Sequence, residues 1–406
     1  MPSFAPPRTR LGRARLSVAA TFALHALVAG SLGPRLPAVK DQADLSAAAL
    51  GAALVGFAAG TFAGTRLAGW PVRRFGSRAV IRAGTPLLGA ALVGPAVSRN
   101  LPALALSLAA LGLVAGLLDV AMNANGVGVE RRIGRPILSG LHGLWSAGML
   151  AGAGGAVVAA ALDVPPLGHF AVVAGVIVLS SVPLLRGLLG PRDLPMAADA
   201  AAEPPRPGWR AGLAGRVLAL GAVGFAAFLA EGAIYDWGAV YLTDELGTSP
   251  AVAAAGVAAF AFGMTTSRLL GDRLSAAFGP VRVVRAGGLV AAVALTLGLL
   301  GSNPWAAAAG FVVLGLGLAP VVPLAFSAAG HLGSDERRDE LGWVVTMSYV
   351  GSILGPAAIG LGTGVAGLRV SLGIPVLLAL TITALAGYVS TAQRVDPAAV
   401  PPHEPF

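Results

Sequence analysis

The segment FGSRAVIRAG at residues 75–84 returns as FGPVRVVRAG at residues 278–287, a shift of 203 residues in a chain of 406. The same shift relates Leu111-Gly112-Leu113 to Leu314-Gly315-Leu316. Matches at distant places in one register indicate a duplicated unit. The sequence therefore predicts that the chain folds as two similar halves.

Long apolar runs surround the repeated segment in both halves. The chain is 56% hydrophobic and 12% charged, with a mean hydropathy of +0.78, which is too apolar for a soluble protein of this length. A run of about 20 apolar residues spans the hydrocarbon core of a bilayer. Twelve such runs are predicted, at residues 16–36, 46–68, 80–98, 102–125, 139–162, 167–189, 213–242, 250–270, 282–301, 305–328, 341–364 and 371–392.

The twelve spans divide into six and six around a segment rich in proline and mixed charges, which indicates a linker. Because each half has an even number of spans, the halves share one orientation and are related by an axis along the membrane normal. The predicted fold is an all-α membrane protein with twelve transmembrane helices in two six-helix bundles. The predicted parts are an N-terminal tail at 1–15, a first bundle at 16–189, a linker at 190–212, a second bundle at 213–392 and a C-terminal tail at 393–406.

The basic residues predict the orientation of the chain. If both tails and the linker lie in the cytoplasm, 24 of the 28 basic residues face that side. Cytoplasmic loops carry an excess of Lys and Arg. We therefore expect a multi-pass protein of the cell membrane with both termini in the cytoplasm.

Several classes of function are excluded by what the chain lacks. It has no cysteine, and its five histidines have no metal-ligand spacing, so we expect no metal site and no cofactor. No phosphate-binding loop or catalytic motif is present, so an enzyme is not indicated. The net charge of +9 is explained by topology, because the Arg clusters lack interleaved aromatic residues. We expect a monomer in a lipid bilayer, with no nucleic-acid partner.

Two acids lie in the seventh predicted span. Glu231 follows about fourteen uncharged residues, at a depth where a charge costs at least about 2.5 to 3.5 kcal/mol. A proton acceptor in a central cavity explains it, and a structural carboxyl bonded between helices is the alternative. Asp236 follows toward the outer end and is predicted to be an outer gate or interface group.

A polar stripe marks the fourth predicted span. Asp119 and Asn123 are four residues apart and share one helix face. They could bind a solute or a proton, or form a polar clamp between helices. His25 in the first span and Trp145 in the fifth complete the polar candidates for a central cavity.

Pairs of small residues recur in the fifth and eleventh spans and predict close helix crossings, with a kink at a proline. These packing residues are Gly148 and Gly152 in the first half, and Gly351, Gly355 and Pro356 in the second.

The segment after the second span is similar to a signature of the major facilitator superfamily of transporters. The matching residues are Gly69, Arg74, Gly76 and Arg78, and Arg73 stands where the signature has aspartate. The second half repeats the segment as Gly271, Asp272, Arg273 and Gly279. The resemblance covers residues 16–392 and implies the fold of that superfamily, with these segments as gating loops.

Three further segments resemble the branch of this superfamily that includes bacterial inner-membrane proteins related to the rhizopine-associated transporter, and more distantly the fucose permease. The segments are Asp119 to Asn123, His142 to Ser146, and Ala230 to Trp237. The resemblance implies a secondary transporter that binds a small-molecule substrate and works by alternating access. Proton coupling is inferred from Glu231 and Asp119, and the candidate solute is small and polar, such as a sugar or a cyclitol. A proton-driven exporter of metabolites or drugs, and a membrane sensor or scaffold that transports nothing, remain alternatives.

Overall fold

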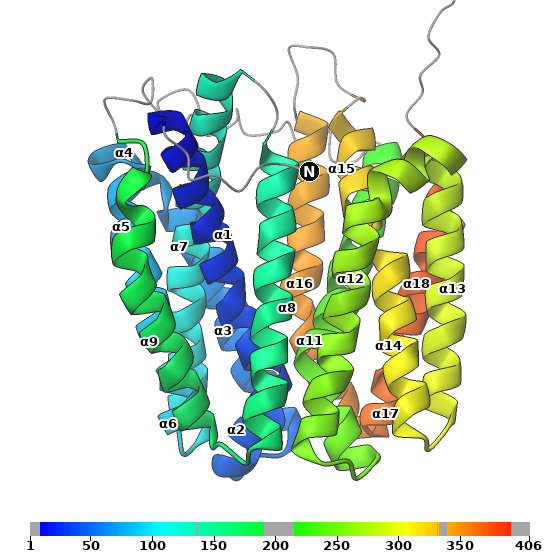
Figure 1. Cartoon of the computed structure of the whole chain (residues 1–406). Coiled ribbons are helices and arrows are strands. Elements are labelled where there is room, and N and C mark those ends of the chain that lie inside the picture. Colours follow the sequence, from blue (N-terminus) through cyan, green and yellow to red (C-terminus); the bar gives the residue numbers. More distant parts are fainter. Residues whose placement is uncertain (1–8, 135–136, 191–214, 331, 333–338, 391–406) are drawn as a thin grey trace, which may run out of the picture.

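The computed structural model describes residues 9–134, 137–190, 215–330, 332 and 339–390. Within these ranges the chain consists of helices joined by short turns and contains no strand (Figure 1). Twelve helical segments in the described ranges are long and apolar enough to cross a membrane. The prediction of an all-α protein with twelve spans is confirmed.

The helices of the first half are α1 (Arg10–Leu32), η1 (Gly33–Arg35), α2 (Leu36–Gln42), α3 (Ala47–Leu67), α4 (Gly69–Phe75), α5 (Ser77–Ala91), α6 (Val93–Val97), α7 (Leu101–Ile133), α8 (Leu138–Ala161), α9 (Pro166–Leu184) and η2 (Leu185–Gly187). Those of the second half are α11 (Gly215–Val240), the π-helical turn η3 (Tyr241–Glu245), α12 (Pro250–Phe278), α13 (Pro280–Leu300), α14 (Pro304–Leu318), α15 (Val321–Gly330), α16 (Asp339–Ala366), α17 (Leu368–Ser371), α18 (Gly373–Leu385) and η4 (Ala386–Val389). Almost all of the predicted linker, the first eight residues of the predicted N-terminal tail and the whole predicted C-terminal tail lie outside the described residues.

Several spans differ from their predicted limits, and α7 and α12 each continue eight residues beyond the predicted end. The first helix begins at Arg10 instead of residue 16, because the Thr9 side chain caps it by accepting a hydrogen bond from the Gly12 N–H at 3.1 Å. The span predicted at 80–98 is interrupted between α5 and α6, and the span predicted at 305–328 is interrupted between α14 and α15. Pro95 and Pro320 lie next to these interruptions, and a proline removes a helical hydrogen bond.

Equivalent glycines bring helices into backbone contact in the two halves. A Cβ atom at Gly112 of α7 would lie 2.1 Å from the carbonyl oxygen of Phe57 in α3. A Cβ atom at Gly315 of α14 would lie 2.6 Å from the carbonyl oxygen of Phe260 in α12. Both glycines, and both residues that they contact, are related by the shift of 203 found in the sequence. The duplication therefore extends to the way the helices cross.

The predicted packing glycines are not all equally crowded. An added Cβ would lie 2.2 Å from a backbone carbonyl oxygen of the neighbouring helix at Gly148, 2.4 Å at Gly152 and 2.3 Å at Gly351. At Gly355 the nearest atom would be 3.5 Å away, which is an ordinary van der Waals contact. Close approach is therefore a property of the first three glycines, and Pro356 follows Gly355 inside α16.

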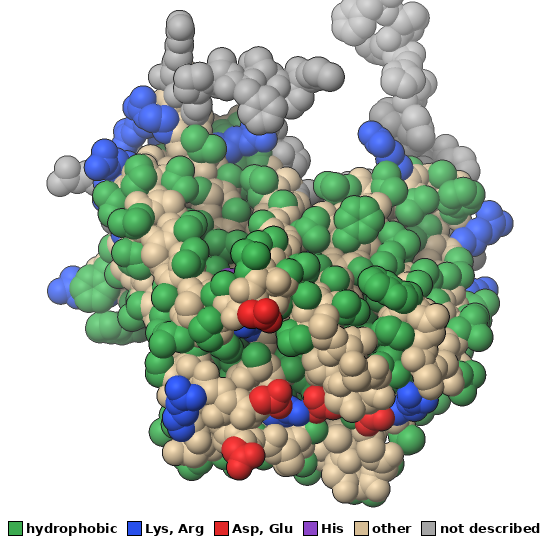
Figure 2. All heavy atoms as spheres, turned by 60° about the horizontal axis from the view of Figure 1, so that its bottom comes forward, with side chains coloured by type: hydrophobic (Ala, Val, Ile, Leu, Met, Phe, Trp, Pro, Cys, Tyr) green, Lys and Arg blue, Asp and Glu red, His purple; other side chains and the backbone are tan. Residues whose placement is uncertain are grey.

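The two halves meet through two equivalent helix pairs, α8 against α12 and α3 against α16 (Figure 1). We call the end of the bundle at which α9 finishes and α11 begins the linker end, and the opposite end the far end. The far end lies at the bottom of Figure 1, and acidic side chains are prominent on it in Figure 2.

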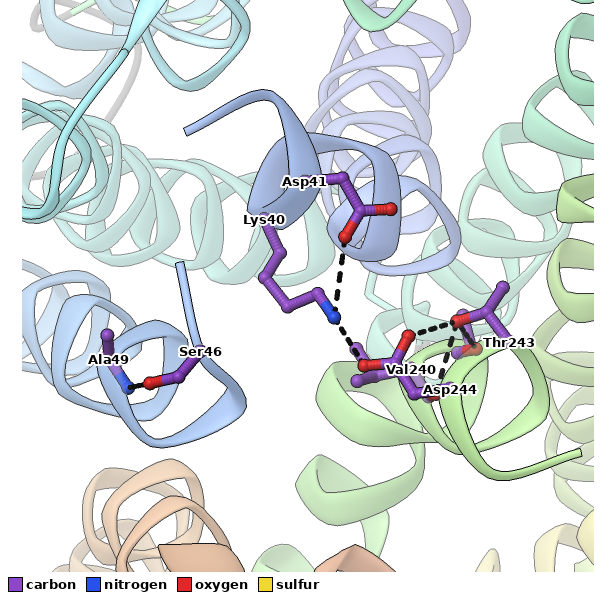
Figure 3. A network of polar contacts seen from close by, with 8 residues as sticks. Lys40, Asp41, Ser46, Ala49, Val240, Thr243 and Asp244 are labelled. Carbon is purple, nitrogen blue, oxygen red and sulfur yellow. Dashed lines mark hydrogen bonds and ion pairs between the residues drawn. The ribbon is translucent and has the colours of Figure 1, made fainter. Parts of the chain in front are cut away.

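Contacts between the halves close the far end. A Cβ atom at Gly51 of α3 would lie only 2.7 Å from the Cα atom of Gly360 in α16, and the fully buried Trp237 packs beside this crossing. Lys40 of α2 forms an ion pair and hydrogen bond with Asp244 of η3 in the other half (Figure 3). Its ammonium also lies 3.4 Å from Asp41. At this end the halves are joined by both close packing and opposite charge.

The glycine crossings generate a test with a built-in control. Gly148→Ala places a methyl group against a carbonyl of α1 and should lower the free energy of unfolding by about 1 to 3 kcal/mol. Gly355→Ala, in the equivalent span of the second half, has room for its methyl group and should unfold near the wild-type temperature. Thermal unfolding of the purified proteins in detergent measures both. Equal midpoints for the two variants would contradict the backbone contact at Gly148.

Candidate functional site

The candidate site lies between the halves and is assembled from α1, α7 and α8 on one side and α11 and α12 on the other. Glu231 lies in the middle third of the span formed by α11 and η3. Arg268 lies in α12, which continues to Phe278, so this charge is also inside a helix and not at its end. Two opposite charges therefore face each other within the apolar bundle.

Glu231 is paired with Arg268. The Nη2 atom of Arg268 lies 3.2 Å from Oε1 and 3.5 Å from Oε2 of Glu231. The side chains are only 13% exposed for Glu231 and 26% for Arg268. Glu231 is therefore not an isolated acid, because α12 supplies a cation that compensates its charge.

Arg268 also reaches across to the first half. Its Nη1 donates to the Ser146 hydroxyl of α8 at 3.2 Å, and its Cζ lies 5.9 Å from the centre of the Trp145 ring. The Thr265 hydroxyl, one turn earlier on α12, lies 3.4 Å from the Ser146 carbonyl oxygen. The Arg268 guanidinium therefore contacts Glu231 in its own half and both Ser146 and Trp145 in the other half. The contacts with the other half depend on how the two halves are placed.

Trp145 connects this arginine to His25. The indole Nε1–H donates to His25 Nδ1 at 3.2 Å, and His25 Nε2 lies 3.2 Å from the Ala115 carbonyl oxygen of α7. Because Nδ1 accepts and a carbonyl can only accept, the two contacts together assign the neutral tautomer with its proton on Nε2. A second proton on His25, at Nδ1, would break the hydrogen bond donated by Trp145.

Asp119 and Asn123 occupy one face of α7, as predicted. The Asn123 amide donates to the Asp119 carbonyl oxygen at 2.9 Å and lies 3.3 Å from its carboxylate. The carboxylate interacts electrostatically with His25 and His142 of its own half and with Tyr349 of α16 in the other half. Within the described ranges, Asp119 forms no ion pair with Lys or Arg. It is a carboxyl group surrounded by groups that can exchange protons.

Asp236 is not part of this network. It lies five residues beyond Glu231, which turns it by more than a third of a turn away from that residue on α11. No hydrogen bond or ion pair joins it to the other candidate residues in the described ranges.

The predicted gating residues lie mostly in helices instead of loops. Gly69 and Arg74 belong to α4, and Arg78 belongs to α5. Gly271, Asp272 and Arg273 belong to α12, which runs through the expected loop without a break. Of the predicted gating residues, only Gly76 and Gly279 stand between helices, with φ angles of +80° and +78°. A positive φ is available to glycine without a steric cost, so these two positions form the tight turns.

Sequence reasoning missed four residues that contact the candidates or close the far end. Arg268 was not among the candidates, Ser146 was noted only as the end of a matching segment, and Lys40 and Asp244 were not considered as a pair. The overlooked signal for Arg268 was the length of its helix, since helical residues continue for ten positions after it. No sequence signal could pair Lys40 with Asp244, because they are 204 residues apart.

Comparison with known proteins agrees with this architecture. The sequence profile of the Major Facilitator Superfamily matches residues 220–405. An uncharacterized MFS-type transporter of Yersinia pestis is 35% identical over 386 residues, covering 93% of this chain and 96% of that protein. The membrane protein MosC of Rhizobium meliloti is 29% identical over 349 residues, covering 85% of this chain and 82% of that protein.

Solved structures share the fold at low sequence identity. The nucleoside transporter NupG, in a mutant form, superimposes with a TM-score of 0.71 at 14% identity and covers 93% of this chain and 98% of its own. A bacterial homologue of the human lysosomal transporter Spinster, in an inward-facing and occupied conformation, gives a TM-score of 0.67 at 17% identity, with coverage of 92% and 96%.

Proposed function

Since the chain belongs to the Major Facilitator Superfamily and is a multi-pass membrane transport protein, we propose that it carries a small polar solute across the membrane together with protons. The observation that supports this most directly is Arg268, which binds Glu231 in its own half and Ser146 in the other. When two bundles rock about a central site, contacts made to both halves are the ones that must change. Arg268 is therefore proposed to act in solute binding and release.

We assign solute binding to the group formed by Glu231, Arg268, Ser146 and Trp145. A carboxylate, a guanidinium and a hydroxyl can hydrogen-bond several hydroxyl groups of one molecule, and an indole offers an apolar face to a ring. These groups suit a polyhydroxylated ring of the sugar or cyclitol class. Glu231 and Arg268 compensate each other's charge, so we assign this pair to the solute and not to the proton.

We assign proton coupling to Asp119, with His25 and His142 beside it. Its carboxylate receives a hydrogen bond only from Asn123 in the described part of the chain and lacks an Arg or Lys partner there. An unpaired carboxylate within an apolar bundle is relieved of its charge by taking up a proton. The neighbouring histidines can pass that proton on. Asn123 would then hold the carboxyl in place in either state.

We further propose that the linker end faces the cytoplasm. The far end carries Asp41, Asp44, Asp163, Asp244 and Glu245 beside its few basic residues, whereas Arg residues dominate the linker end. The excess of basic residues on the cytoplasmic side favours this orientation. With this orientation, the contacts of Gly51 with Gly360 and of Lys40 with Asp244 close the outer side.

The transport proposal is tested in proteoliposomes after a thermal-shift screen of labelled hexoses and cyclitols has found a solute that stabilises the protein. Asp119→Asn should still exchange labelled for unlabelled solute, but a pH gradient should no longer drive accumulation. Glu231→Gln should weaken solute binding about ten- to hundredfold, because hydrogen bonds to charged groups contribute about 1.5 to 3 kcal/mol. Asp163→Asn, at an exposed acid on the far end, is the control and should transport like the wild type. Accumulation by Asp119→Asn at the wild-type level would exclude the assigned proton site.

The orientation is tested in the natural cysteine-free background. Single cysteines are placed at two exposed positions, Arg132→Cys at the linker end of α7 and Ser302→Cys at the far end beside α13. In intact cells, a membrane-impermeant maleimide should label only the cysteine at position 302, and both should react after the membrane is opened. Labelling at position 132 in intact cells would reverse the orientation.

A further inference from the structure

A groove between α5 and α9 lies away from the central site, on the outside of the first half. The two helices pack side by side at one edge of the molecule (Figure 1). The groove has a volume of about 390 Å³, which is in the range of small-molecule sites. Its lining residues are Arg82, Pro86, Val178, Ser181, Val182, Leu185 and Arg186.

The walls of the groove are apolar and face outward. Val178 is 38% exposed and Val182 is 61% exposed, although both lie within the span formed by α9 and η2. In a membrane-spanning helix, side chains exposed on the outside of the bundle meet lipid. The groove is therefore a hollow in the lipid-facing surface that hydrocarbon can fill.

The linker end of the groove is basic. Arg82 donates from Nε to the Leu185 carbonyl oxygen at 3.2 Å and from Nη2 to the Arg186 carbonyl oxygen at 3.1 Å. These two bonds fix the guanidinium at the mouth and use two of its five N–H donors. Arg78 and Arg186 lie close enough for their charges to repel that of Arg82.

Nothing in the described part of the chain compensates this charge, since none of the three arginines forms an ion pair there. Their positions near the linker-side ends of α5 and α9 place them at the level of the lipid headgroups. A fixed guanidinium with free donors is suited to a phosphate group. The apolar walls continue from that point toward the middle of the membrane.

We propose that this groove is a binding site for an anionic phospholipid, with its phosphate on Arg82 and Arg186 and one acyl chain along Val178 and Val182. Basic pockets between transmembrane helices are known to bind anionic headgroups. A free phosphate ion would satisfy the arginines but leave the apolar walls unused. A zwitterionic lipid would fill the walls but bring a positive group toward three arginines.

The second half provides a natural comparison. Arg285 of α13 corresponds to Arg82 by the 203-residue shift, but Val389 stands at the position that corresponds to Arg186, and Tyr388 at that of Leu185. The second half therefore has a counterpart of Arg82 but none of Arg186. Arg285→Gln is a matched control that removes the same charge from the same depth.

The test measures binding of short-chain phosphatidylglycerol to the purified full-length protein by native mass spectrometry and by the thermal shift that it produces. Arg186→Gln keeps the backbone carbonyl that holds Arg82 and should weaken binding about fivefold, as expected for one basic contact. Val182→Asp should weaken binding similarly by placing a negative charge in the acyl path. Arg285→Gln should bind like the wild type.

Three results would overturn the proposal. The first is wild-type affinity for phosphatidylglycerol in Arg186→Gln. The second is equal loss in Arg285→Gln, which would indicate general attraction by surface charge. The third is a thermal shift by inorganic phosphate, or by phosphatidylcholine, as large as that by phosphatidylglycerol, which would exclude the selectivity for an anionic lipid.

Discussion

Glu231 and Arg268 are opposite charges inside an apolar bundle, and each is stable at its position only because the other is there. A single charge at this depth is costly, and breaking such a pair by removing one partner leaves the other uncompensated. The pair lies within one half, between α11 and α12, at 3.2 Å. It therefore holds Arg268 at the interface, where the same guanidinium can reach Ser146 and the Trp145 ring of the other half. The contacts of Arg268 with the other half therefore depend on its ion pair with Glu231.

The helices are packed closely within each half, and fewer contacts join the two halves to each other. Within the halves, helices cross at glycines so closely that a single methyl group would meet a backbone carbonyl, as at Gly112 and Gly315. The connections between the halves include the two helix pairs, with the Gly51 crossing in one and the Arg268 and Thr265 contacts with Ser146 in the other, and the Lys40 ion pair. The Lys40–Asp244 pair is partly exposed, with side-chain exposures of 10% and 33%, so solvent screens part of its attraction. Such a contact can close one end of a bundle and be given up when the bundle opens.

Much of the fold could be predicted from sequence because apolar length and internal repetition are properties of the chain itself. The site was predictable only in part. Glu231, Asp119, His25 and Trp145 stand out as polar residues on apolar helices, and the structure places all four near the interface. Arg268 was missed because a basic residue near the predicted end of a span is normally explained by topology. Asp236 was included among the candidates because it is an acid in an apolar span, although it lies on a different face of α11 from Glu231.

The contact partners of these residues could not be predicted from sequence, because they depend on how separate helices dock. Lys40 meets Asp244, and Arg268 meets Ser146, across the interface between the two bundles. The same limit applies to the groove between α5 and α9, since Arg82 and Arg186 are brought together by the packing of these two helices. Spacing along the chain indicates which residues share a helix face, but not which face of another helix they will meet.

We propose that the two halves rock as units about the site that Arg268 bridges. Distances between spin labels test it most directly, with one pair at the far end (Arg99→Cys and Ser302→Cys) and one pair at the linker end (Arg74→Cys and Arg282→Cys). Lys40→Gln, which removes the ion pair at the far end, should lengthen the first distance and shorten the second in the same sample. A longer far-end distance with no change at the linker end would mean local loosening, and would contradict the rocking of rigid halves.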